Sequence, residues 1–257
     1  MKNTTIALLV LGSLIITGCG GQYSSAEGLW TGTSNTGRTV NALILSDGSY
    51  WVMYSTVNSA TANSSAATNN AAVMGGAMQG ILTETSGTVV GTFTSADGVD
   101  FNQEGQGISA FTMTGSYSTK NTLSGQVSYT ANSQQVTFQA TYNKDYDTKP
   151  SLATIAATYT GTAGSVAAGS SSGTLTISAS GAITGSDNSG CQFTGAVTPH
   201  ASGNVYNMTI TFGGGSCASG TSTDTGIAYY NAAQKNLIGV TLNTARTDSF
   251  IFSGTRP

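Results

Sequence analysis

From residue 28 onward, the chain consists of short stretches in which apolar and polar residues alternate, separated by turn residues at close and regular spacing. Alternation with a period of two places successive side chains on opposite faces, so each stretch predicts a half-buried β-strand. The chain has no helical periodicity of useful length. The pattern therefore predicts an all-β protein of the antiparallel sandwich or barrel type.

Eight strands are predicted in the first half of the chain, joined in order as an up-and-down meander. Tight-turn pairs such as Asp47-Gly48 and Asn132-Ser133 separate neighbouring strands. The predicted strands are 28–34, 38–46, 49–56, 77–84, 88–95, 110–118, 122–130 and 134–142.

The second half of the chain repeats the first half, with the order kept and only loop lengths changed. The segments 28–33, 43–48, 79–83, 120–125 and 136–138 return as 157–162, 175–181, 194–198, 235–239 and 250–252. The strands of the second copy are predicted at 155–163, 173–178, 182–186, 190–198, 204–212, 225–231, 236–243 and 248–254. We expect two eight-stranded antiparallel barrels in tandem, because closure removes the exposed edges of a meander that lacks edge lysines.

A charged stretch with a proline separates the two copies. It is the most charged part of the chain and predicts a linker at 143–151, between a first domain at 28–142 and a second at 152–257. A long hairpin loop is the alternative interpretation.

Large side chains and glycines alternate on one face of several predicted strands, and this pattern predicts filled barrels. Phe111, Met113, Gly115 and Tyr117 lie on one face of a predicted strand. The second copy would place Phe193, Gly195 and Val197 opposite Tyr206, Met208, Ile210 and Phe212, with Val197 paired to Tyr206. Large side chains alternating with glycine suit a tapering, packed barrel, so an open ligand cavity is the less favoured alternative.

The first 18 residues have the layout of a secretory signal, with Lys2 followed by an apolar run at 6–15 that is too short to span a bilayer. The residues at 16–19, Ile-Thr-Gly-Cys, resemble the lipobox of bacterial lipoproteins. The resemblance implies a lipoprotein signal peptide at 1–18, a lipidated tether at 19–27, and fatty acyl chains on Cys19. A secreted protein with a conventional cleavage site, or a buried N-terminal strand, is the alternative.

The residue after that cysteine is Gly20 and not aspartate. In the lipoproteins that the chain resembles, an aspartate there usually signals retention at the inner membrane. The resemblance therefore implies an outer-membrane location, and it leaves open which face of the membrane the protein occupies.

The other two cysteines predict a disulfide. Cys191 and Cys217 form an even pair in an exported, oxidising setting once Cys19 is acylated. The bond would tie the loop after residue 212 to the start of the strand at 190. A metal pair is the alternative, but His200 is the single histidine and two thiolates do not complete a tetrahedral zinc site.

Composition excludes several partners. Only 7% of the residues are charged, against about a quarter in an average protein. A net charge of -3 with eight Lys and Arg lacks the basic stripe that nucleic acid requires, and it argues against electrostatic attachment to anionic lipid.

No residue pattern predicts catalysis, a cofactor or a metal site, and we expect that the protein is not an enzyme. His200 lies in a predicted hairpin turn without a partner nucleophile in the pattern. Asx turns account for the aspartates beside Gly, Ser or Thr: Asp47, Asp97, Asp187 and Asp224. The segment 97–100 is similar to a fragment of a calcium loop, although a turn is the preferred interpretation.

A low-complexity loop at 57–76 and the aromatic residues before it provide the candidate binding surface. Tyr50, Trp51, Met53 and Tyr54 place bulky groups on both faces of one predicted strand. One of the aromatic residues is expected to face outward, which makes Trp51 and Tyr54 the ligand-binding candidates. Packing of that face against the neighbouring copy is the alternative.

The combination of lipobox, glycine-rich tether and meanders that begin Gly-x-Trp resembles surface lipoproteins of Gram-negative bacteria, of the transferrin-binding and factor H-binding types. This resemblance implies loops that bind a protein or a glycan, but it identifies no binding residue. Gly28-x-Trp30 also resembles the start of lipocalins and avidins, which implies a carrier of a small apolar ligand. A purely structural envelope lipoprotein is the third hypothesis, and the oligomeric state stays open.

Overall fold

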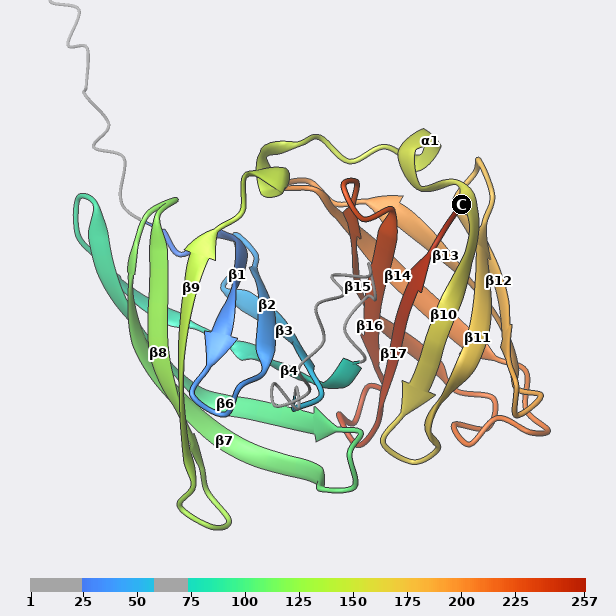
Figure 1. Ribbon diagram of the computed structural model, residues 1–257, viewed down its shortest axis with the longest axis horizontal. Coiled ribbons are helices and arrows are strands. Elements are labelled where there is room, and N and C mark those ends of the chain that lie inside the picture. Colours follow the sequence, from blue (N-terminus) through green and yellow to red (C-terminus); the bar gives the residue numbers. More distant parts are fainter. Residues whose placement is uncertain (1–24, 58–73) are drawn as a thin grey trace, which may run out of the picture.

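A computed structural model describes residues 25–57 and 74–257. The chain folds into two closed antiparallel barrels side by side, as predicted (Figure 1). The segment 16–19 that resembles a lipobox, including Cys19, and most of the 57–76 loop lie outside the described residues.

The first barrel is a meander whose first and last strands pair with each other. Its strands are β1 Gly28–Ser34, β2 Thr39–Ile44, β3 Ser49–Ser55, β4 Met74–Ile81, β5 Thr83–Ser86, β6 Val90–Asn102, β7 Gly107–Ser118, β8 Thr122–Tyr129 and β9 Gln135–Tyr142. β4 and β5 are two pieces of one predicted strand, interrupted at Leu82, and both pair with β6. They therefore count together as one of the eight strand positions around the barrel.

β6 is longer than predicted. The pair Asp97-Gly98 suggested a turn, but it forms a β-bulge at which the register of β6 against β7 shifts between Ser95 and Gly98. A bulge adds a residue to one strand and bends it without ending it. Gly98 is required there, because a Cβ would lie 2.3 Å from the Phe111 ring.

The second barrel has the same order of strands and closes through β10 and β17. Its strands are β10 Ala157–Ser165, β11 Gly169–Ile177, β12 Ala182–Asp187, β13 Gln192–Pro199, β14 Val205–Phe212, β15 Thr223–Asn231, β16 Asn236–Leu242 and β17 Ser249–Thr255. The charged segment that joins the barrels contains the 3-10 helix η1 Lys144–Asp147 and the single-turn helix α1 Leu152–Ile155.

Two details of the predicted register are wrong. Val197 pairs with Met208 and not with Tyr206, a slip of two residues that keeps the same faces. The match of Leu43 to Leu175 is one residue out, because Leu175 lies opposite Tyr159 whereas Ala42 lies opposite Trp30. A slip of one residue exchanges the faces of a strand, and Leu43 therefore points out of its barrel while Leu175 points in.

The outward apolar residues of the first barrel pack against the second barrel. Side chains of β1–β4 and β6 meet those of β14–β17 in one buried cluster. Trp51 points out of its own barrel, as expected for one aromatic residue of this strand, but it is only 9% exposed because it packs in this cluster. The alternative interpretation, packing against the neighbouring copy, therefore holds for Trp51. Arg246, in the turn between β16 and β17, crosses to the first barrel and donates to the carbonyl oxygens of Gln79 (2.7 Å) and Asp97 (2.9 Å).

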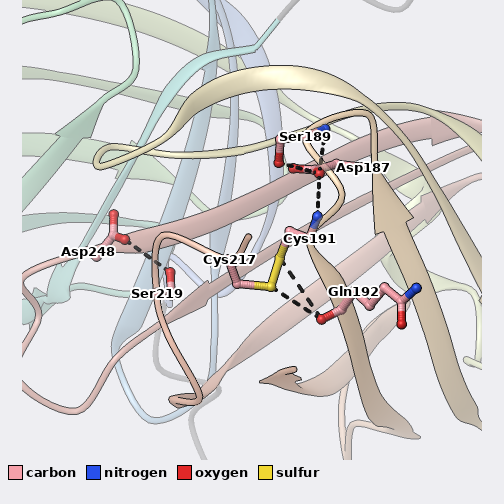
Figure 2. The surroundings of a disulfide bond; sticks show 7 residues. All are labelled: Asp187, Ser189, Cys191, Gln192, Cys217, Ser219 and Asp248. Atoms are coloured by element: carbon pink, nitrogen blue, oxygen red, sulfur yellow. Dashed lines mark hydrogen bonds between the residues drawn. A yellow bond between two sulfur atoms is a disulfide. The ribbon is translucent and has the colours of Figure 1, made fainter. Parts of the chain in front are cut away.

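The second barrel is filled with side chains, as the alternation predicts. Phe193, Phe212 and Phe250 meet edge to face near one end, with ring centroids 5.0 to 6.4 Å apart. The Cys191–Cys217 disulfide closes the same end of the core and confirms the predicted pair. It ties the loop after β14 to the start of β13 (Figure 2).

Replacing both Cys191 and Cys217 by serine should lower the free energy of unfolding by about 3 to 4 kcal/mol, because the two cysteines are 26 positions apart in the sequence and the open loop regains chain entropy. Urea unfolding followed by circular dichroism measures the change. A reducing agent should produce the same shift in the parent protein and none in the double variant. Equal stability of the two proteins would contradict the role assigned to the bond.

Candidate functional site: a cavity in the first barrel

The first barrel is hollow over part of its length. A cavity of about 400 Å³ lies among inward-facing side chains and reaches the end of the barrel formed by the β1–β2, β6–β7 and β8–β9 turns. We call this the open end. The expectation of a filled interior is therefore wrong for this barrel, although it holds for its neighbour. Apolar groups form most of the wall, among them Ile44, Met78, Val127 and Phe138.

The opposite end of the first barrel, where β1 begins, is closed by a small hydrogen-bonded group. The indole nitrogen of Trp30 donates to the carbonyl oxygen of Ala26 (2.9 Å). The carboxylate of Glu84 accepts from the backbone nitrogen of Ala26 (3.2 Å) and the hydroxyl of Tyr117 (3.0 Å). The second barrel repeats the first of these bonds, since the hydroxyl of Tyr159 donates to the carbonyl oxygen four residues earlier. The Gly-x-Trp motif thus marks the closed end of the first barrel.

Three positions explain why one barrel is hollow and its twin is not. Met78 pairs with Asp100 across β4 and β6, in the place where Phe193 pairs with Phe212 across β13 and β14. Val136 likewise occupies the position of Phe250, because the strands that carry them pair in the same register with β1 and β10. In the first barrel, the positions of the three phenylalanines of the second barrel are thus occupied by Met78, Asp100 and Val136. All three of these residues line the cavity.

Asp100 is the centre of a buried polar group near the open end. Its side chain is 5% exposed and accepts hydrogen bonds from the hydroxyls of Tyr54 (2.7 Å) and Tyr129 (2.6 Å), one on each carboxylate oxygen. The side-chain amide of Asn102 donates to the oxygen of Tyr54 (3.1 Å). These side chains come from β3, β6 and β8, so the closed barrel is what brings them together.

An ion pair lies beside this group at the rim of the cavity. The guanidinium of Arg38 pairs with the carboxylate of Glu104 and also donates to the carbonyl oxygen of Ser55 (2.8 Å). It lies 5.1 Å from the centre of the Tyr54 ring, within range of a cation–π contact. Both side chains of the pair are partly exposed, at 21% and 29%.

The electrostatics of the cavity follow from burial. Removal from water raises the pKa of Asp100, and the hydrogen bonds from Tyr129 and Tyr54 and the charge of Arg38 only partly oppose this. Burial and the neighbouring carboxylate raise the pKa of Tyr54 and of Tyr129 well above the usual value for tyrosine. The two phenols therefore act as neutral donors.

The other residues that the sequence singled out lie in different parts of the fold and do not form a common site. Asp47 and Asp187 accept from the backbone nitrogen two residues later, as the Asx-turn prediction requires. Asp224 does not lie in a turn, because it is buried within β15 and accepts from the hydroxyl of Ser222.

His200 follows β13 in the turn before β14, and its Nδ1 accepts from the backbone nitrogen of Ser202 (3.2 Å). Asp97 sits at the bulge in β6, where its carboxylate accepts from the backbone nitrogen of Ile81 and pairs with Arg246. Asp97 and Asp100 are thus engaged by different partners, unlike ligands of one calcium loop. Residues 25–57 and 74–257 hold no group of three or more His, Cys, Asp or Glu that could bind a metal ion.

Tyr54 is the predicted candidate that lines the cavity, whereas Asp100, Tyr129 and Asn102 were missed as a group. One signal could have found them. In the segment 98–102 the apolar Val99 and Phe101 alternate with Gly98, Asp100 and Asn102. That alternation identifies a strand with polar residues on its inner face once the apolar face is known to pack outward.

Comparison with known proteins gives no family: no protein-family model matches the chain, and no curated protein matches it. In the part of the chain that the structure describes, no helix has the length and apolar character needed to cross a membrane.

Substitution of Asp100 by asparagine tests the buried carboxylate. A raised pKa means that the folded state binds the proton more tightly than the unfolded state, so the stability from this group is lost as the pH rises through the folded-state pKa, above about 4. The stability of the parent protein relative to Asp100→Asn should therefore fall between pH 4 and pH 8. Urea unfolding of both proteins across this range measures the difference. A difference that is constant or that grows with pH would contradict the assignment.

Proposed function

We propose that this protein binds a small amphipathic molecule inside its first barrel, as a lipocalin-like carrier, and that acyl chains on Cys19 tether it to the outer membrane. The observation that carries the proposal is the cavity of about 400 Å³ in one barrel, beside a twin that is filled. The volume is within the range of about 300 to 1,000 Å³ that is usual for small-molecule sites. The wall is mainly apolar and a few polar groups converge at one end, which is also typical of such sites.

Binding without catalysis suits the polar groups of the cavity. Asp100, Tyr54 and Tyr129 are held by one another, and no histidine or cysteine is among the cavity-lining residues of the described chain. Presentation of loops to a protein or a glycan stays a prediction from the sequence, because no contact of the described residues bears on it.

The tether would give the cavity a defined orientation. The described chain begins at Ser25, beside the closed end of the first barrel, and six residues from Cys19 to this point span at most about 21 Å. In a protein anchored at Cys19, the closed end would therefore lie near the bilayer. The open end would face away from it, toward the aqueous phase from which a ligand could enter.

Filling the cavity should abolish binding. Val136→Phe places in the first barrel the residue that the second barrel has at the same position, and it should weaken the binding of the apolar fluorophore N-phenyl-1-naphthylamine at least tenfold without loss of stability. Fluorescence titration measures the affinity. Thr137→Phe, on the outer face of the same strand, is the matched control and should bind as the parent does. Undiminished binding by Val136→Phe, or no binding by the parent, would refute the proposed function.

The anchor can be tested separately. Cys19→Ser should eliminate incorporation of an alkyne-labelled palmitate and release the protein from the membrane fraction, because a lipobox cysteine is the acylated residue. Labelling of expressing cells, followed by fractionation and blotting, provides both readouts. Continued labelling of the variant would show that the acyl chains are attached elsewhere.

A further inference from the structure

The cavity contains a buried carboxyl group whose direct partners are neutral. Both hydrogen bonds to the carboxylate of Asp100 come from tyrosine hydroxyls, and no Lys, Arg or His of the described residues lies within ion-pair distance of it. Glu104, the other carboxylate near the open end, is paired with Arg38. Ionising a buried carboxyl group without a counter-ion is costly, and a cation bound beside it would offset that cost.

We propose that the ligand carries a cationic amine, which binds at Asp100, and an apolar tail, which extends toward the closed end of the barrel. This inference rests on the proposed function and names the class of ligand. Each carboxylate oxygen of Asp100 has one tyrosine donor, and a carboxylate has about four acceptor positions, so it can accept further hydrogen bonds from an ammonium group.

An anionic head group fits the same end of the cavity poorly. The hydroxyls of Tyr54 and Tyr129 already donate to Asp100, so their protons are not available to a ligand carboxylate. The guanidinium of Arg38 is engaged by Glu104 and by the carbonyl oxygen of Ser55. The carboxylate of an anionic ligand would therefore lie near those of Asp100 and Glu104. The nearby cation, Arg38, is already paired with Glu104.

The aromatic rings at this end favour a cation as well. Arg38 lies over the Tyr54 ring, whereas Tyr129 is a second aromatic residue that lines the cavity at this end. Aromatic faces attract ammonium groups by their quadrupole, with a larger effect where water is excluded.

The volume limits the length of the tail. A cavity of about 400 Å³ holds roughly a dozen water-sized groups, at about 30 Å³ for each group. An unbranched amine of about ten carbons is of this size. Its tail would run along the apolar wall past Met78 and Val127 toward Ile44.

Three probes of equal chain length test the head group: decylamine, 1-decanol and decanoate. At pH 7.5 the first is cationic, the second neutral and the third anionic, because amines titrate near 10.4 and carboxylates near 4. The protein is the full chain with Cys19→Ser, so that no acyl chain competes for the probes. Displacement of N-phenyl-1-naphthylamine should give decylamine an affinity at least tenfold above that of 1-decanol, with decanoate weakest.

Asp100→Asn should reduce the preference for decylamine over 1-decanol to less than threefold while the affinity for 1-decanol changes little. Asp47→Asn, which neutralises an exposed carboxylate in the turn between β2 and β3, is the control and should keep the full preference. The ranking of the three probes on the parent protein requires no variant to fold. Equal or tighter binding of 1-decanol or decanoate would overturn the inference and leave the proposed function intact. Failure of all three probes and of the fluorophore would overturn both.

Discussion

Closure of each meander on itself is the constraint on which the rest of this structure depends. β1 pairs with β9, β4 pairs with β6, and β10 pairs with β17, so each meander closes on itself, although the chain has few charges with which to protect an open edge. Closure also fixes the diameter of the barrel and turns every second side chain inward. The interior volume is thus set by the backbone, and the inward residues only decide whether it is filled. Phenylalanine at three positions fills one barrel, and Met78, Asp100 and Val136 leave the other open.

The two barrels share one topology, but each uses its outer surface for the other. In the first barrel the residues of β3 that point outward, Trp51 and Met53, are as apolar as those that point inward. A strand with two apolar faces needs two cores, and the second barrel supplies the outer one. The packed, disulfide-closed barrel thereby forms a wall against which the hollow one rests.

Most of the fold was predictable because the information is local. Alternation and turn residues located the strands to within a few residues, except where the bulge at Asp97-Gly98 imitated a turn and shortened β6. The disulfide followed from counting cysteines. The cavity could not be predicted, since its volume depends on which residues of eight strands meet at one level. A slip of a single residue, as between Leu43 and Leu175, exchanges inner and outer faces. Tyr54 was identified for its aromatic ring, and Asp100 was missed because its strand was ended too early.

The contact of Arg246 with the first barrel makes the second barrel part of the site. Its guanidinium donates hydrogen bonds to the carbonyl oxygens of Gln79 and Asp97. These two residues lie on β4 and β6, the strands whose pairing places Met78 opposite Asp100. Arg246 therefore contacts the bulge in β6 three residues before Asp100. The packed barrel therefore supports, through one side chain, the strand of its neighbour that carries the buried carboxylate.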